Sequence, residues 1–94
     1  MYALVMIRYE KPLDEVAKLT DAHRAWLKQW SQRGVVLASG PFVPRTGGCL
    51  LVRAPDETTI HQVRDGDPFV INGMASYEIT VWAPTMGLEA LDKM

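Results

Sequence analysis

The stretch from Pro12 to Arg33 has the apolar spacing of one long amphipathic helix. Its apolar residues recur every three or four positions, which places them in a single stripe along a helix. The members of this stripe are Val16, Leu19, His23, Trp26, Leu27 and Trp30. Pro12 suits the first turn of a helix, and Gly34 suits the position just past its end. Such a stripe has to be buried, so the rest of the chain must supply a partner for it.

Apolar runs rich in β-branched and aromatic residues predict four strands. They cover Tyr2–Tyr9, Val35–Pro41, Cys49–Arg53 and Met74–Ala83. A second, shorter helix is predicted to begin at Pro55 and to end near Gly66. The segment from Val70 to Gly73 is either a loop or one helical turn, and residues 85–94 are a tail or a short helix. The resulting order, β-α-β-β-α-β, is the ferredoxin-like arrangement. We therefore expect an α+β fold in which the helices cover one face of a four-stranded antiparallel sheet.

The predicted strands are apolar on both of their faces. Leu4 and Met6 would lie on one face of the first strand, opposite Val5 and Ile7. Because one layer of helices covers only one face, the other face needs a second cover. The simplest cover is a second copy of the sheet, so we expect a homodimer through the sheet faces. With 94 residues, the chain is expected to form a single domain, 1–94.

Composition and charge exclude several classes of function. The ten Lys and Arg residues are balanced by eleven Asp and Glu and form no basic cluster, so we expect no nucleic-acid partner. The first apolar run closes at Arg8, far too early to span a membrane, and we expect no membrane association. Cys49 is the only cysteine, which fits a protein of the reducing cytoplasm. No metal or cofactor motif is present, so we expect neither group.

Two residues stand out as candidates for chemistry, and each has a plainer explanation. His23 interrupts the apolar stripe, as either a core histidine with one hydrogen bond or a functional group facing a cleft. Asp67 precedes Pro68, so it should sit at a bend and is either a cap or a functional carboxylate. Asp65 and Asp67 could also suggest a metal site, although no further ligand lies near them. Ser39 lacks the surroundings of a serine nucleophile and is expected to line a pocket.

Three motifs, "DAHRAWL", "LASGPF" and "DGDPFVINGM", together resemble the YCII-related family over nearly the whole chain. The resemblance implies a ferredoxin-like dimeric α+β barrel, similar to that of the muconolactone isomerases. It also implies an active site built on a His–Asp pair, which the motifs match to His23 and Asp67. The residues implied to lie in the same pocket, and to bind substrate there, are Ser39, Gly40, Pro41 and Phe69.

The chemistry that such a pair could perform is proton transfer. The pKa of a histidine side chain is ordinarily about 6.5. A carboxylate that bonds one ring nitrogen fixes the tautomer, that is, which nitrogen carries the proton. Without a nucleophile or a cofactor motif, the open reaction types are isomerisation, elimination (including dehydrohalogenation) and lyase or hydrolase steps on a small molecule. Trp26 and Trp30 predict a narrow, apolar pocket. Two alternatives stay open: a non-catalytic dimeric module that binds a small ligand or a protein, and a haem-binding barrel.

Overall fold

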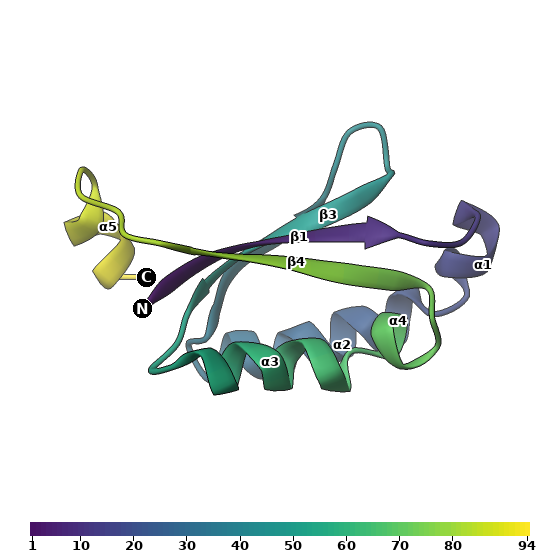
Figure 1. Ribbon diagram of the computed structural model, residues 1–94, viewed down its shortest axis with the longest axis horizontal. Helices are drawn as coiled ribbons and strands as arrows, with labels where there is room; N and C mark the ends of the chain where they lie inside the picture. The colour runs from purple at the N-terminus through teal and green to yellow at the C-terminus, as the bar shows by residue number, and fades with distance from the viewer.

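The computed structural model describes residues 1–94 and has four strands and five helices (Figure 1). In chain order they are β1 (Tyr2–Tyr9), α1 (Leu13–Ala17), α2 (Thr20–Gln32), β2 (Val36–Pro41), β3 (Gly47–Arg53), α3 (Glu57–Gly66), α4 (Pro68–Ile71), β4 (Ala75–Trp82) and α5 (Leu88–Asp92). The strands form one sheet in the order β2-β3-β1-β4, and every neighbouring pair is antiparallel. The predicted α+β, ferredoxin-like architecture is confirmed.

The long helix predicted over Pro12 to Arg33 is in fact two helices. The backbone N–H groups of Lys18 and Leu19 each bond a carbonyl three residues back rather than four, which ends α1. A new helix, α2, begins immediately afterwards. The apolar stripe nevertheless stays on one side of both helices, because Val16 and Leu27 are buried in the same core.

Two segments that the sequence left open form short helices. Residues 68–71 make the single turn α4, and Asp67 before it has extended backbone angles, as expected ahead of Pro68. The C-terminal segment forms α5, which is tied to one end of the sheet. There the Arg53 guanidinium donates to the carbonyls of Leu91 and Asp92 at 3.1 and 3.0 Å, and the Tyr2 hydroxyl donates to the Asp92 carboxylate.

The core lies between the sheet and one layer of helices formed mainly by α2 and α3, which run below the sheet in Figure 1. The two helices are joined by Trp26, whose indole N–H donates to the Val63 carbonyl at 2.8 Å. Gly66 at the end of α3 lies directly under this ring, and a Cβ at that position would overlap with the indole. Gly66 therefore permits α3 to pack closely against the Trp26 ring. This packing fixes the end of α3 and hence the position of Asp67, the next residue.

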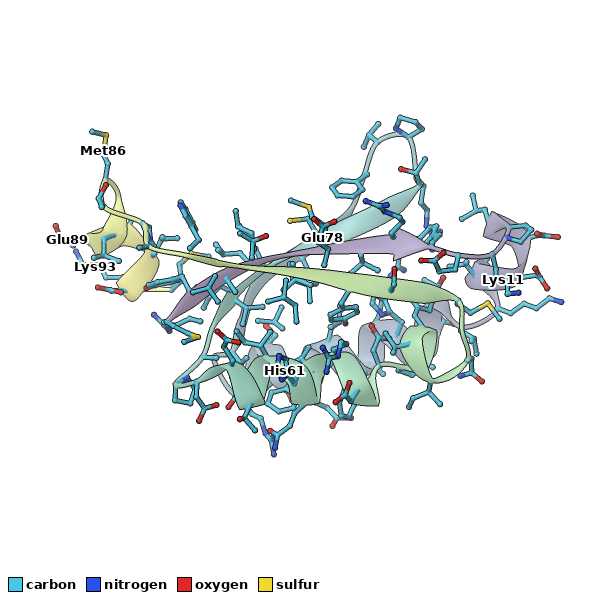
Figure 2. All side chains as sticks on the ribbon, viewed as in Figure 1. Lys11, His61, Glu78, Met86, Glu89 and Lys93 are labelled. Carbon is cyan, nitrogen blue, oxygen red and sulfur yellow. The ribbon has the colours of Figure 1, made fainter.

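The opposite face of the sheet is not covered by α2 and α3, and only α5 contacts it, at one end. Glu78 on β4 points away from the helix layer on this face, as Figure 2 shows. Met6 and Trp82 are large apolar side chains that are 38% and 40% exposed. Leu4 and Leu51, which pair across β1 and β3, lie between them on the same face. The alternation predicted for the first strand is confirmed, since the side chains of Val5 and its inward neighbours are buried.

None of the five helices has the length and apolar character needed to cross a membrane.

Candidate active site

A cavity of about 390 Å³ opens between α2 and the helix-facing side of the sheet. Its wall contains five of the six residues that the sequence singled out: His23, Ser39, Gly40, Pro41 and Phe69. The sixth, Asp67, is fully buried and forms no part of the wall. It lies behind His23, so a ligand in the cavity would meet the imidazole and not the carboxylate.

His23 and Asp67 are in direct contact. The Nδ1 atom of His23 is 2.8 Å from both Oδ1 and Oδ2 of the carboxylate. The histidine side chain is 12% exposed, while that of Asp67 has no exposed surface. The pair therefore joins a buried charge to a ring that reaches the cavity.

Two further donors complete the surroundings of the Asp67 carboxylate. The backbone N–H of Phe69 donates to Oδ1 at 2.9 Å, and the hydroxyl of Tyr77 on β4 donates to Oδ2 at 2.6 Å. A buried carboxylate is tolerated when hydrogen bonds replace its hydration in this way. Burial, together with the charge of Asp67, raises the pKa of Tyr77 well above its ordinary value, so this hydroxyl stays protonated as a donor.

The local sequence explains why the carboxylate points at the histidine. Pro68 holds the preceding residue in an extended conformation and supplies the first residue of α4. Asp67 is then the N-cap of this turn, and its side chain bonds the N–H of Phe69. The Phe69 ring, two residues on, stacks on the His23 ring with centroids 4.0 Å apart and planes 8° apart. The tripeptide from Asp67 to Phe69 thus positions both the carboxylate that contacts His23 and the aromatic ring that stacks on it.

The remaining nitrogen of the imidazole, Nε2, faces accessible space. With the Nδ1 proton donated to Asp67, the neutral ring has its lone pair at Nε2. No buried side-chain nitrogen or oxygen lacks a hydrogen-bond partner, and Nε2 of His23 makes no hydrogen bond, so this atom is accessible. The arrangement can accept a proton at Nε2 and hold the resulting imidazolium against the Asp67 carboxylate.

The expectation that Trp26 and Trp30 line the pocket is wrong. Neither Trp26 nor Trp30 lines the cavity, because the first turns to α3 and the second is buried in the core. Five of the sixteen lining residues are hydrophobic, and the lining also includes three cationic side chains: Arg24, Lys28 and Arg45.

Several residues of this site were not predicted. Thr20, Arg24, Lys28 and Ser31 form a polar row on α2 beside the apolar stripe, and their spacing could have revealed them. Tyr77 could have been noticed as a hydroxyl in the inward row of β4. Arg45 had no such signal, because its position depends on how the β2–β3 hairpin folds back.

The metal alternative has no geometry to support it. Asp65 is exposed and pairs with Arg64 at 2.8 Å, while Asp67 points the other way into the core. The guanidinium of Arg64 lowers the pKa of Asp65 through their hydrogen bond. No three His, Cys, Asp or Glu side chains converge into a group that could hold a metal ion.

Comparison with known proteins adds two findings. Residues 1–83 match the family model of the YCII-related domain. Among solved structures, the fold is similar to that of 5-chloro-2-hydroxyhydroquinone dehydrochlorinase (TftG) from Burkholderia phenoliruptrix AC1100, solved in complex with 2,5-dihydroxybenzoquinone. The TM-score is 0.76 at 22% sequence identity, over 90% of this chain and 96% of the other. No curated protein matches the sequence.

Proposed function

Since this chain belongs to the YCII-related domain family, we propose that it is an enzyme that transfers protons on a small molecule, with His23 as the acid–base group and Asp67 as its partner. The observation that carries the proposal is the orientation of one ring. Nδ1 of His23 is held by a buried carboxylate at 2.8 Å, and the opposite nitrogen is accessible on a residue that lines the cavity. A core histidine with one hydrogen bond would account for the first feature but not for the second.

The hydrogen-bond pattern favours proton transfer over attack by a nucleophile. Ser39 lines the cavity, but His23 makes side-chain hydrogen bonds only to Asp67, so no serine is activated by it. In the proposed step Nε2 removes a proton from the substrate, and the new imidazolium is stabilised by the Asp67 carboxylate. Returning that proton to another substrate atom gives an isomerisation, and loss of a leaving group gives an elimination.

Elimination of hydrogen chloride is the reaction that we favour within this class. The dehydrochlorinase with a similar fold supports this choice. The similarity between the two structures concerns the fold alone. For a hydroxylated aromatic ring, His23 first carries a hydroxyl proton to the carbon bearing chlorine, which gives the keto tautomer. A second hydroxyl proton then passes to Nε2, its electron pair moves through the conjugated system toward that carbon, and chloride leaves. The reaction needs no external oxidant or reductant, so the groups found in this site are sufficient for it.

The test is chloride release from 5-chloro-2-hydroxyhydroquinone by the purified protein, followed with a chloride electrode under argon. We expect the protein to accelerate release by about 10²- to 10⁴-fold over the buffer, as general acid–base catalysis does. A muconolactone, with isomerisation followed by NMR, is the second substrate. A folded protein that accelerates neither reaction would contradict the proposal and favour the non-catalytic, ligand-binding alternative.

We also propose that the protein works in the cytoplasm as a homodimer joined through the open faces of its sheets. Apolar side chains on this face, including Met6 and Trp82, remain 38% and 40% exposed in the single chain. Pairing two copies would remove them from water, and an isologous contact buries the same patch on both. The Arg8–Glu78 pair at 3.5 Å lies on the same face, where it could form contacts across the interface.

Analytical ultracentrifugation tests the dimer. We expect the wild type to sediment at twice the chain mass of 10.5 kDa at micromolar concentration. Leu51→Glu should give a monomer, because it places an unpaired charge in the middle of the apolar face. Ile71→Glu introduces the same charge at a 66%-exposed position on α4, and should stay dimeric. A wild type that sediments at the single-chain mass would refute this assembly.

A further inference from the structure

The charges around the cavity are all of one sign. Three of its sixteen lining residues are cationic (Arg24, Lys28 and Arg45), and none is Asp or Glu. None of the three takes part in an ion pair. The chain as a whole has a net charge of −1, so the positive wall is a local feature and not a consequence of composition. A cavity with three cations and no anion attracts a negatively charged ligand.

Arg45 is the cation whose position is fixed. It reaches back from the β2–β3 hairpin, where its Nε donates to the Tyr9 hydroxyl at 3.1 Å and an outer nitrogen donates to Thr20 Oγ1 at 2.8 Å. Its guanidinium also lies 5.9 Å from the centre of the Tyr9 ring. Both hydroxyls are neutral, so they orient the guanidinium without compensating its charge.

This anchoring leaves most of the guanidinium available. A guanidinium has five N–H donors, and the structure uses two of them here. Thr20 is on α2, one turn before His23, so the bond to Thr20 holds Arg45 close to the acid–base group. Arg24 and Lys28 follow on the next turns of α2 and are exposed, which suits them to attract a ligand to the mouth of the cavity.

We propose that the cavity binds small planar anions, and that Arg45 is the residue that selects them by binding their negative oxygen. This deepens the proposed function and rests on it, because the anion is taken to be the molecule whose proton passes to His23. Removing a proton from such a molecule increases the negative charge on its conjugated oxygen. A guanidinium already fixed at that oxygen would stabilise this developing charge.

Two kinds of planar anion carry such an oxygen, and paired probes distinguish them. 2,5-Dihydroxybenzoquinone is a vinylogous acid that ionises in neutral buffer, while 2,5-dimethoxybenzoquinone has the same ring and no charge. Benzoate and benzamide form the corresponding pair for a carboxylate. Titration calorimetry with all four compounds at pH 7.5 gives each dissociation constant. We expect the anion of at least one pair to bind at least tenfold more tightly than its neutral partner.

Substitution of Arg45 identifies the source of that preference. Arg45→Met should weaken binding of the preferred anion by about 10- to 100-fold, which is the range for losing a charge-assisted hydrogen bond. The dissociation constant of the neutral partner should stay within threefold of its wild-type value. Arg33→Met is the matched control: it removes the same charge from an arginine that does not line the cavity and lies over Trp30. Its dissociation constants should match those of the wild type.

The possible results distinguish anion binding by Arg45 from the proposed catalytic function. If Arg45→Met does not fold, salt titration of the wild type replaces it: the dissociation constant of the anion should rise steeply with NaCl, and that of the neutral partner should not. Equal affinity for charged and neutral partners in both pairs, or anion binding that ignores Arg45, would overturn the inference. Arg45-dependent anion binding without any proton-transfer activity would leave the inference standing and defeat the proposed function.

Discussion

The His23→Gln variant is expected to lose turnover by about 10²- to 10⁴-fold and to remain folded. Glutamine keeps a polar side chain of similar reach, but it has no group that accepts and returns a proton near neutral pH. The proposed role of the wild-type ring rests on Nε2, which is accessible and bonds nothing in the protein. Initial rates of chloride release, with folding checked by circular dichroism and urea denaturation, measure both parts of this expectation.

His61→Gln is the matched control for this experiment. His61 lies on α3, outside the cavity wall, and makes no side-chain hydrogen bond, so its loss should leave the rate unchanged. Two results for His23→Gln would count against the proposal. Retained turnover would remove His23 from the chemistry. A variant that fails to fold, with the control intact, would favour the plainer explanation of a structural histidine in the core.

Asp67→Asn is expected to cost both stability and turnover. The carboxylate accepts from three donors, on His23, Phe69 and Tyr77, whereas an amide has one oxygen and adds two N–H donors of its own. At least one buried donor then loses its acceptor. Breaking a buried, hydrogen-bonded charge in this way typically destabilises a protein by about 3–5 kcal/mol. Urea denaturation measures the loss, which should accompany a fall in turnover of at least tenfold.

Tyr77→Phe separates the two effects of Asp67→Asn. It removes one donor from the carboxylate and leaves the contact between Asp67 and His23 in place. We therefore expect a smaller loss of stability, about 1.5–3 kcal/mol, and a turnover much nearer to wild type. The ¹⁵N shifts of His23 provide a further readout, since Nδ1 should lose its fixed proton in Asp67→Asn and keep it in Tyr77→Phe. Unchanged stability and rate in Asp67→Asn would show that the carboxylate has neither role.

The sequence predicted the fold well because its evidence is local and periodic. Strand alternation and the apolar stripe determined the element order and the inward face of β1, which the structure confirms. The break at Lys18–Leu19 escaped prediction, since residues on both sides of it keep the same apolar face. Asp67 and Pro68 predicted a bend from the properties of proline alone, and that prediction also holds.

The contents of the site were harder to predict, for a different reason. A helical pattern gives the face on which a residue lies, but not the direction in which its side chain turns. Trp26 shares a stripe with His23, yet its indole packs against α3 and takes no part in the cavity wall. Arg45 is 25 residues from Thr20, its nearest hydrogen-bond partner in sequence, and only the folded hairpin brings the two together.

The two halves of the site belong to different parts of the molecule, which matters for how such a protein can diverge. The Asp67 carboxylate is buried, caps a helical turn and bonds a strand residue, so few substitutions there would be tolerated. Arg24 and Lys28 are exposed on α2, and Arg45 comes from a hairpin loop. Changes at these outer positions leave the core untouched. Descendants of one ancestor could therefore exchange one ligand for another while inheriting the same His23–Asp67 pair.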